Sequence, residues 1–404
     1  MIPCSPPLLV DGEDVSWFRD QPEAARGAAA ALGRRIGLGE ERTAQLVLAV
    51  AEMAANLTQH AVDGALLLRV LRNQAVAGVE VIAVDHGPGM SDVPAALRDG
   101  MSTAGTLGIG LGAVQRLADS LAIHSQPGLG TLQLARFWPR PLPASVTGEP
   151  AVGGITRPIG GEQVCGDAWA ARTDTGGSNS RSATDHNTAR SRDNGTPRHD
   201  WAALTGTQPG RQEPPAHAPH RLPVAARTLP VHAAVPGSGP GILVMSCDGL
   251  GHGPLAAAAA QAAVHAFRTS TARTPEQAIQ HVHRALRGTR GAAVAIARLE
   301  PDGRVLFCGV GNVTAALVTA TTRTLLLSQP GIVGHQMHQL RTYEQQLPAH
   351  GVLAMHSDGL SERWKASDLA GLLHHPPALI AAGLLRHAGT RRDDASVVIA
   401  KAAR

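Results

Sequence analysis

Lysine and aromatic residues are scarce in this chain. Lysine occurs only at positions 365 and 401, and the aromatic residues make up 2% of the 404 residues. The lack of lysine excludes a nucleotide-binding P-loop from the first 364 residues, because that loop needs a lysine after its last glycine. The basic residues are nearly all arginine and are scattered among acids, so the net charge of +4 forms no basic stripe. We therefore expect no nucleic-acid partner.

Cysteine is rare too, and the cysteines stand far apart, at positions 4, 165, 247 and 308. No Cys-x-x-Cys pair and no Cys/His cluster with zinc-ligand spacing occurs, which argues against a zinc site and favours buried thiols of a reducing compartment. The N-terminus has neither the basic region nor the apolar core of a signal peptide. The charge-free run 305–322 is long enough to span a membrane, but Gly309-Val-Gly-Asn312 interrupts it and predicts a hairpin. We expect a cytoplasmic protein with no membrane partner.

The length and the changes in composition predict two domains. A chain of 404 residues exceeds what one core normally accommodates. Residues 12–138 alternate between helical and strand patterns, the proline-rich residues 139–153 resemble a linker, and a second domain covers 154–402. Within it, residues 173–239 have almost no apolar periodicity, so they predict a disordered, low-complexity insertion.

Two apolar runs in the second domain end in the same tripeptide, Asp-Gly-Leu. Asp248 follows the first run and Asp358 follows the second, each at the expected end of a buried strand. Asp167 and the pair Asp393-Asp394 also lie at strand ends or turns. Carboxylates brought together in this way make an oxygen site for a divalent metal. The alternative is that Asp-Gly is a common turn after a strand, and spacing alone does not show that the acids converge.

Three further motifs stand in the first domain. Glu52 and Asn56 share one face of a predicted helix at 40–61, where they could polarise a water and ligate Mg²⁺, unless this is simply a solvated face. Asp85 ends an apolar strand and is followed by Gly87 and Gly89, which leave room for a flat ring close to the backbone. Glycines 108, 110 and 112 precede a helix and can present N–H groups to phosphates. The spacing does not match a Rossmann motif.

This ordered set, Glu-x-x-x-Asn, Asp-x-Gly-Pro-Gly and Gly-x-Gly-Leu-Gly, resembles the ATP-binding domain of the GHKL superfamily, closest to anti-sigma-factor serine kinases and the stressosome switch kinase. The resemblance covers residues 12–138 and implies an α/β sandwich. It implies that Asn56 holds Mg²⁺, that Asp85 binds adenine, and that Glu52 is a general base for phosphorylating a serine. It also implies a nucleotide pocket shaped by Gly87, Gly89, Gly108, Gly110, Leu111 and Gly112.

The acidic motifs of the second domain resemble the SpoIIE-type branch of metal-dependent (PPM) protein serine/threonine phosphatases. This resemblance covers residues 154–402 apart from the insertion and implies an α-β-β-α sandwich. It implies two Mn²⁺ or Mg²⁺ ions that activate a water and neutralise phosphoryl charge. Asp248 would bridge the metals and the Gly249 carbonyl would bind one of them. Asp358 and Asp393 would complete the other, Asp167 would be a further ligand, and Asp394 is the less favoured ligand of its pair.

The chain departs from the phosphatase pattern in two places. Many relatives have a second Asp shortly after the Gly-Asp motif, and residues 168–172 contain none. The insertion also separates two strands that would carry metal ligands, where an exposed hairpin loop would accommodate it. Both departures bear on the number of metal ions rather than on the class.

Together these resemblances imply a phosphatase acting on a phosphorylated STAS-type anti-sigma-factor antagonist or a stressosome-like protein. The ATP-binding domain in the same chain would phosphorylate, recognise or sequester the same partner, and a sigma factor is a further candidate partner. The alternative is an ATP-gated partner-binding switch whose phosphatase half is an inactive scaffold. A sensor histidine kinase is disfavoured, because no phosphoacceptor dimerisation helix or long coiled coil is present.

Overall fold

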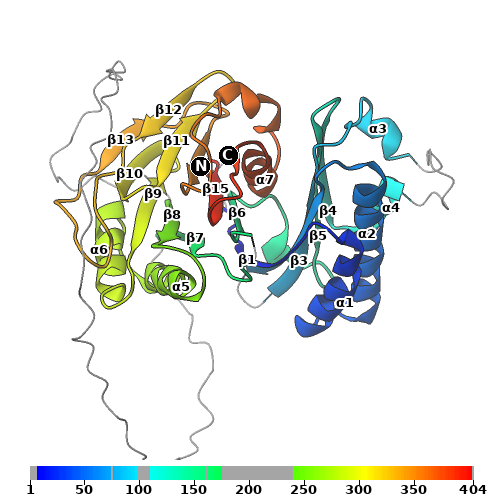
Figure 1. Cartoon of the computed structure of the whole chain (residues 1–404), viewed down its shortest axis with the longest axis horizontal. Helices are drawn as coiled ribbons and strands as arrows, with labels where there is room; N and C mark the ends of the chain where they lie inside the picture. Colours follow the sequence, from blue (N-terminus) through cyan, green and yellow to red (C-terminus); the bar gives the residue numbers. More distant parts are fainter. Residues whose placement is uncertain (1–6, 74–75, 99–109, 161, 175–239, 403–404) are drawn as a thin grey trace, which may run out of the picture. The chain divides into compact units, whose positions relative to one another are not determined.

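The N-terminal part is a five-stranded antiparallel sheet with helices along one face (Figure 1). The computed structural model describes residues 7–73, 76–98, 110–160, 162–174 and 240–402. The strand order is β1-β2-β3-β5-β4. The strands are β1 (Asp11–Phe18), β2 (Ala65–Asn73), β3 (Val76–Val84), β4 (Ser120–Gln126) and β5 (Gly130–Phe137). The helices are η1 (Pro22–Ala24), α1 (Ala25–Arg35), α2 (Glu40–His60), α3 (Val93–Ala96) and α4 (Gly110–Leu117).

Strand β2 is buried on both faces. Leu66 and Leu68 pack into the core formed with α1 and α2, whereas Leu67 belongs to a different core, and all three side chains are fully buried. Because side chains alternate along a strand, this continuous leucine run serves two cores at once. The second core contains the apolar residues of α7 (Pro377–Ala388), a helix of the C-terminal part.

The C-terminal part contains two five-stranded sheets. One has the order β13-β10-β9-β8-β7 and the other β12-β11-β14-β15-β6. The strands are β6 (Val152–Arg157), β7 (Asp167–Thr173), β8 (Ile242–Gly249), β9 (Ala292–Leu299), β10 (Arg304–Val310), β11 (Thr314–Val318), β12 (Arg323–Leu326), β13 (Tyr343–Gln346), β14 (Val352–His356) and β15 (Ala395–Ala400). Besides α7, the helices are η2 (Ala144–Val146), α5 (Pro254–Thr269), α6 (Pro275–Ala285), η3 (Ala366–Asp368) and η4 (Ala370–Leu372).

These elements form four layers. Val244 on β8 and Met355 on β14 belong to one core between the two sheets. Helices α5 and α6 cover the outer face of the first sheet through a core that includes Phe267 and Ile279, and α7 covers the outer face of the second. The arrangement is an α-β-β-α sandwich, which confirms the predicted fold class.

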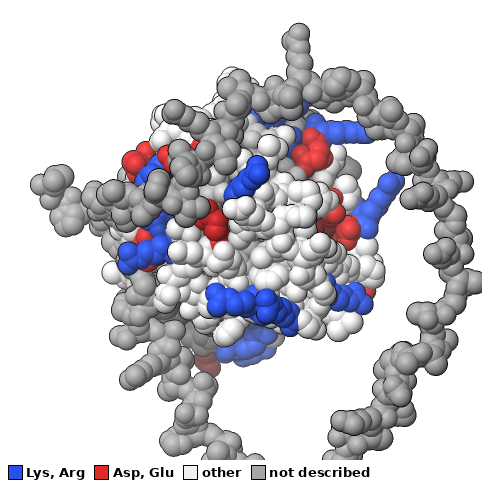
Figure 2. Space-filling model, turned by 90° about the vertical axis from the view of Figure 1, so that its left-hand side faces the viewer, with Lys and Arg blue, Asp and Glu red and all other residues white. Residues whose placement is uncertain are grey.

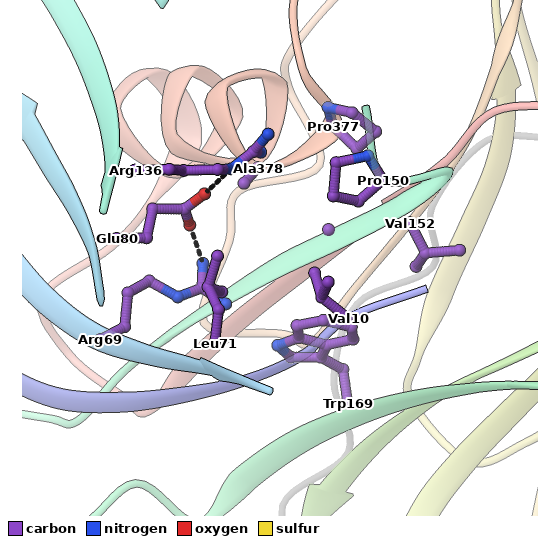
Figure 3. A pocket seen from close by; sticks show the side chains of 11 residues that line it. Val10, Arg69, Leu71, Glu80, Arg136, Pro150, Val152, Trp169, Pro377 and Ala378 are labelled. Carbon is purple, nitrogen blue, oxygen red and sulfur yellow. Dashed lines mark hydrogen bonds and ion pairs between the residues drawn. The ribbon is translucent and has the colours of Figure 1, made fainter. Parts of the chain in front are cut away.

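A buried ion network lies on the second face of the N-terminal sheet (Figure 3). Glu80 on β3 lies between Arg69 on β2, at 3.4 Å, and Arg136 on β5, at 2.7 Å, and all three side chains are at most 5% exposed. They line a small pocket together with Trp169 of β7 and Pro377 of α7. Buried charges of this kind are tolerated only when they are paired, so this side of the sheet is built to be covered.

The predicted hairpin around Gly309–Asn312 is wrong. Strand β10 pairs with β9 and β13, whereas β11 pairs with β12 and β14 in the other sheet. The turn therefore carries the chain from one sheet to the other. None of the described helices is long and apolar enough to cross a membrane. The predicted insertion at 173–239 lies outside the described residues, except for its first two residues.

Charged side chains of both signs are spread over the face of the C-terminal part shown in Figure 2. On the side of β13 and α6, several arginine or lysine side chains lie near one another across the lower part of the view, whereas the acidic side chains lie mostly above them, with uncharged surface between.

Candidate active sites

Asp167 and Asp248 lie opposite each other on neighbouring strands. The antiparallel register pairs Asp167, the first residue of β7, with Asp248 near the end of β8. Residues directly opposite in such a pair point to the same face of the sheet. Trp169 and Val244, which share that face, belong to the core between the two sheets, so both carboxylates point between the sheets at one end of the sandwich.

The second sheet brings further acids to the same end. Asp358 follows β14 and Asp393 precedes β15, two antiparallel neighbours. The two turns pass so close together that a Cβ atom on Gly359 would lie 1.9 Å from the carbonyl oxygen of Asp394. Only glycine fits there, which explains the glycine after Asp358. Asn312, at the crossover between the sheets, donates from Nδ2 to Asp358 Oδ2 at 3.0 Å.

The carboxylates repel one another strongly. Burial, and then the charges of Asp167, Asp358, Asp393 and Asp394, raise the pKa of Asp248 to about 9. Burial also raises the pKa of Asp167 to about 7, although the hydroxyls of Ser357 and Ser396 partly offset this effect. A cluster whose members resist ionisation lacks positive charge.

Asp394 differs from its neighbour. It is 2% exposed, and its two oxygens accept the N–H groups of Ile159 and Gly166 at 2.7 and 2.8 Å. Asp393 is half-buried and its Oδ1 accepts only a local hydrogen bond, from the N–H of Asp394. Asp394 thus fastens the Gly166-Asp167 turn to β15, and Asp393 is the freer carboxylate.

The acids fit a divalent cation by chemistry. The Oδ2 atom of Asp167 is buried and has no hydrogen-bond partner among the described residues. An orphaned carboxylate oxygen beside other uncompensated acids is the environment that hard cations such as Mg²⁺ and Mn²⁺ occupy. The described residues contain no group of three histidine, cysteine or acidic side chains already placed around one ion. The acids therefore share one end of the sandwich without forming a closed coordination shell.

Several residues that support these acids carried no prediction. His356 is fully buried, and burial lowers its pKa. Trp364 donates from Nε1 to His356 Nε2 at 3.2 Å, so the proton of the neutral ring sits on Nδ1 and is donated to the Ser357 carbonyl at 2.8 Å. The ring thereby anchors the turn that holds Asp358. The sequence signal for this supporting role is the pattern Met-His-Ser-Asp, in which a polar residue stands at the end of an apolar strand.

His252 stands in the loop between β8 and α5. Its side chain is 59% exposed, and its Nδ1 lies 3.4 Å from Glu162 Oε1. Gly249 packs so tightly that a Cβ atom would lie 2.6 Å from the Ala256 carbonyl oxygen. That contact alone explains why a glycine stands at position 249. It does not bear on the Gly249 carbonyl, to which the resemblance assigns a metal ion.

In the N-terminal part, Glu52 and Asn56 lie one turn apart on α2. Both side chains are half-buried, on a helix whose other residues at helical spacing, such as Met53 and Leu57, fill the core. An acid and an amide on the half-exposed edge of a buried helix lie outside the core, where solvent or a ligand can reach them. This position is compatible with contact to a bound nucleotide and its ion.

Asp85 follows β3 and is 9% exposed. Its Oδ1 accepts the Gly87 N–H at 2.7 Å, so the carboxylate is held in place and can accept a further hydrogen bond from a ligand amine. A Cβ atom on Gly87 would lie 2.6 Å from the His60 carbonyl oxygen, and one on Gly89, whose φ is +67°, 2.1 Å from that of Gln126. These glycines are therefore required by the packing of the loop itself.

The third motif is described only in part. Gly110, with a φ of +44°, begins α4, and Leu111 and Gly112 are buried in its first turn. Gly108 lies outside the described residues. The start of a helix can present main-chain N–H groups to a phosphate.

Two known families match different parts of the chain. Residues 19–136 match the histidine kinase-like ATPase domain, and residues 238–403 match stage II sporulation protein E (SpoIIE). The serine/threonine-protein kinase RsbT of Bacillus subtilis is 34% identical over 117 residues, which are 29% of this chain and 88% of RsbT.

Solved structures to which this chain is similar include those of SpoIIE and RsbX. The PP2C phosphatase domain of SpoIIE from Bacillus subtilis, with a fragment of its regulatory domain, is 12% identical, with a TM-score of 0.39 over 93% of this chain and 94% of that one. RsbX in complex with magnesium is 16% identical, with a TM-score of 0.40 over 61% of this chain and 92% of that one.

Proposed function

Since this chain belongs to the RsbT-like histidine kinase-type ATPases through its N-terminal domain and carries a SpoIIE-type phosphatase domain at its C-terminus, we propose that it dephosphorylates a regulatory protein that its ATPase domain also engages. The substrate would be a phosphoserine or phosphothreonine of a STAS-type anti-sigma-factor antagonist or a stressosome-like protein. A kinase-type domain and a phosphatase domain on one chain are suited to adding and removing the same phosphate.

The convergence of Asp167, Asp248, Asp358 and Asp393 at one end of the sandwich carries the proposal. Bound Mn²⁺ or Mg²⁺ would supply a nucleophilic water near neutral pH and neutralise the phosphoryl oxygens. In our proposal these four carboxylates hold the ions, with the Gly249 carbonyl as a further ligand. Asn312 orients Asp358, and Asp394 fixes the turn that carries Asp167.

A phosphate-release assay tests the phosphatase. The full chain is incubated with Mn²⁺ and a serine-phosphorylated STAS-domain protein, alongside an Asp248→Asn variant. The variant should be slower by at least about 100-fold, because it loses a carboxylate that holds the metal. Mn²⁺ should raise the unfolding temperature of the unaltered chain and not that of the variant, since the ion relieves repulsion centred on Asp248.

The same assay separates the two functional alternatives. Asp302, an exposed acid in the turn between β9 and β10, provides a matched control, and Asp302→Asn should keep full activity. Equal activity in the Asp248→Asn variant would remove the mechanism. No activity in either protein, combined with ATP-dependent binding of the partner, would support a nucleotide-gated switch with an inactive phosphatase scaffold instead.

The position of Glu52 and Asn56 favours ATP-dependent serine phosphorylation as a second activity. Here ATP with Mg²⁺ would be the cofactor, Asn56 would hold the ion, Asp85 would bind adenine, and Glu52 would accept the proton of the serine hydroxyl. Glu52→Ala should lower phosphate transfer from labelled ATP to the partner by roughly 100-fold or more while ATP still binds. Transfer at an unchanged rate would show that Glu52 is not the base.

We place this activity in the cytoplasm. The thiols of Cys165, Cys247 and Cys308 are free in the structure, and burial raises the pKa of each. Unpaired, unreactive thiols suit a reducing compartment.

A further inference from the structure

Four arginine side chains line one pocket. Arg19 follows β1, Arg157 ends β6, Arg386 lies in the last turn of α7, and Arg391 stands in the turn before β15. About 450 Å³ of space within the pocket is not filled by protein atoms, and this space includes open solvent. None of the four proposed metal-binding acids and none of residues 110–112 lines it.

The positive charge in this pocket exceeds the negative charge. Asp63 is the only carboxylate among the lining residues. It pairs with Arg391 and lies 3.6 Å from Arg19, and its side chain is 45% exposed. Arg386 and Arg157 donate to neutral groups, the main-chain carbonyls of Asp85, at 2.9 Å, and of Thr390. Counting only the lining side chains, four guanidinium groups face one carboxylate.

The arginine side chains also repel one another, which disfavours their charged forms. Burial lowers the pKa of Arg19, and the charge of Arg391 adds to this effect. Burial and then the charges of Arg19 and Arg391 lower the pKa of Arg157, despite Asp394 nearby. A guanidinium remains protonated under almost all conditions, so this repulsion persists until a counter-charge arrives.

We propose that this pocket binds a small anion that carries two or more phosphate groups. Guanidinium groups match phosphate oxygens in geometry and keep their charge when partly desolvated. The indole of Trp17, whose Nε1 is already bound to the Thr156 carbonyl at 2.9 Å, forms a fixed apolar wall. The anion could be free or could be the diphosphate part of a nucleotide, and both share the chemistry that the pocket recognises.

Calorimetric titration of the full chain with pyrophosphate, in EDTA and without nucleotide, tests the proposal. We expect saturable binding to one site. Arg391→Ala and Arg19→Ala should each weaken it roughly tenfold, because each removes a charge-assisted contact. Asp63→Asn should tighten binding, since it removes the competing carboxylate. Asparagine also tolerates the positive φ of 50° at that position.

Control variants test whether pyrophosphate binds at one of the other proposed sites instead. Arg34→Ala, which removes an exposed arginine of α1, should bind pyrophosphate like the unaltered chain. Asp248→Asn and Asp85→Asn should do the same, because pyrophosphate bound near the acids or in the nucleotide site would respond to them. Binding that is absent in the unaltered chain, or that survives both arginine substitutions, would overturn the proposal.

A second arm identifies the source of the anion. ADP is titrated into the Asp85→Asn variant, whose adenine contact is weakened. ADP that binds there and competes with pyrophosphate indicates a nucleoside diphosphate, whereas binding of pyrophosphate alone indicates a free inorganic anion. The contrary outcome is that ADP displaces pyrophosphate from the Arg391→Ala variant as readily as from the unaltered chain. That result would contradict the four-arginine pocket as the binding site.

Discussion

Two adjacent aspartates illustrate how one residue type serves two purposes. Asp393 and Asp394 follow each other, yet the second is buried with both oxygens bound to main-chain N–H groups, whereas the first has only a local contact. A carboxylate that satisfies two buried amides stabilises the fold. One that is held loosely beside other carboxylates is available to a cation.

Substituting each aspartate should separate the two roles. Asp394→Asn places an NH₂ group against an N–H donor and should lower the free energy of unfolding by about 1–3 kcal/mol. Asp393→Asn removes only repulsion and should leave it unchanged or slightly higher without metal. Urea unfolding in EDTA measures both. Equal losses in the two variants would mean that Asp394 has no special structural role.

Sequence patterns identified these acids but not their convergence. Asp248 and Asp358 each end a visible apolar run, so their positions at strand ends were predictable from the local pattern. That Asp167 stands opposite Asp248 depends on the register of β7 with β8, which are separated by the long insertion. The partners of Asp394, at Ile159 and Gly166, lie more than 200 residues away, and no local signal points to them.

At the scale of elements, strand β2 shows that the N-terminal sheet has no solvent-facing side at its centre. Leu67 and Leu68 are equally buried, one against the core that contains α7 and the other against α2. A sheet with one free face would show alternating apolar and polar residues instead.

Leu67→Ala should therefore destabilise the chain as much as Leu68→Ala does, by about 2–5 kcal/mol each. Both substitutions remove the same buried side chain from the same strand, so each serves as the other's control. Denaturant unfolding of the full chain measures the loss. A loss below about 1 kcal/mol for Leu67→Ala alone would mean that the α7 side of the sheet is open to water.

Elements with a clear local pattern were predicted closely, and those that depend on distant partners were not. The helix predicted at 40–61 coincides with α2 to within one residue, because its apolar residues recur at helical spacing. The hairpin at Gly309–Asn312 was wrong because the sequence shows two strands and a turn but not that each strand pairs elsewhere. Strand β1 was missed, because its charged residues Asp11, Glu13 and Asp14 hide the strand pattern.

At the scale of the whole molecule, a histidine group joins β4 to the segment before α7. The ring of His375 lies 5.2 Å from that of His124 and 4.1 Å from that of His374. Burial, followed by the charges of His374 and His124, lowers the pKa of His375 from 6.5 to about 4. The folded chain thus keeps this imidazole neutral where an unfolded chain would protonate it.

This shift should make the fold sensitive to mild acid. Because the folded pKa is the lower one, the stabilisation is complete above about pH 6.5 and is lost as the pH falls toward 4. The buried acids Asp167 and Asp248 act in the opposite sense, so the comparison must be made with a variant. His375→Gln should lose less stability than the unaltered chain between pH 7.5 and 5 in urea unfolding. Parallel curves would exclude a role for His375.

The packing of helix α7 constrains which substitutions this chain can accept during evolution. Its apolar side chains share one core with Leu67 and Leu132 of the N-terminal sheet and with Val397 and Ile399 of β15. A Cβ atom on Gly383 of α7 would lie 2.4 Å from Leu372 Cδ1 and 3.2 Å from Leu132 Cδ1. A larger residue at 383 would therefore need room from Leu372 in the same domain and also from Leu132 in the N-terminal sheet. In evolutionary descendants of this chain, core residues of the kinase-type domain and of the phosphatase domain should therefore vary together. Exchanging either domain for a free-standing homologue should leave this shared core poorly packed.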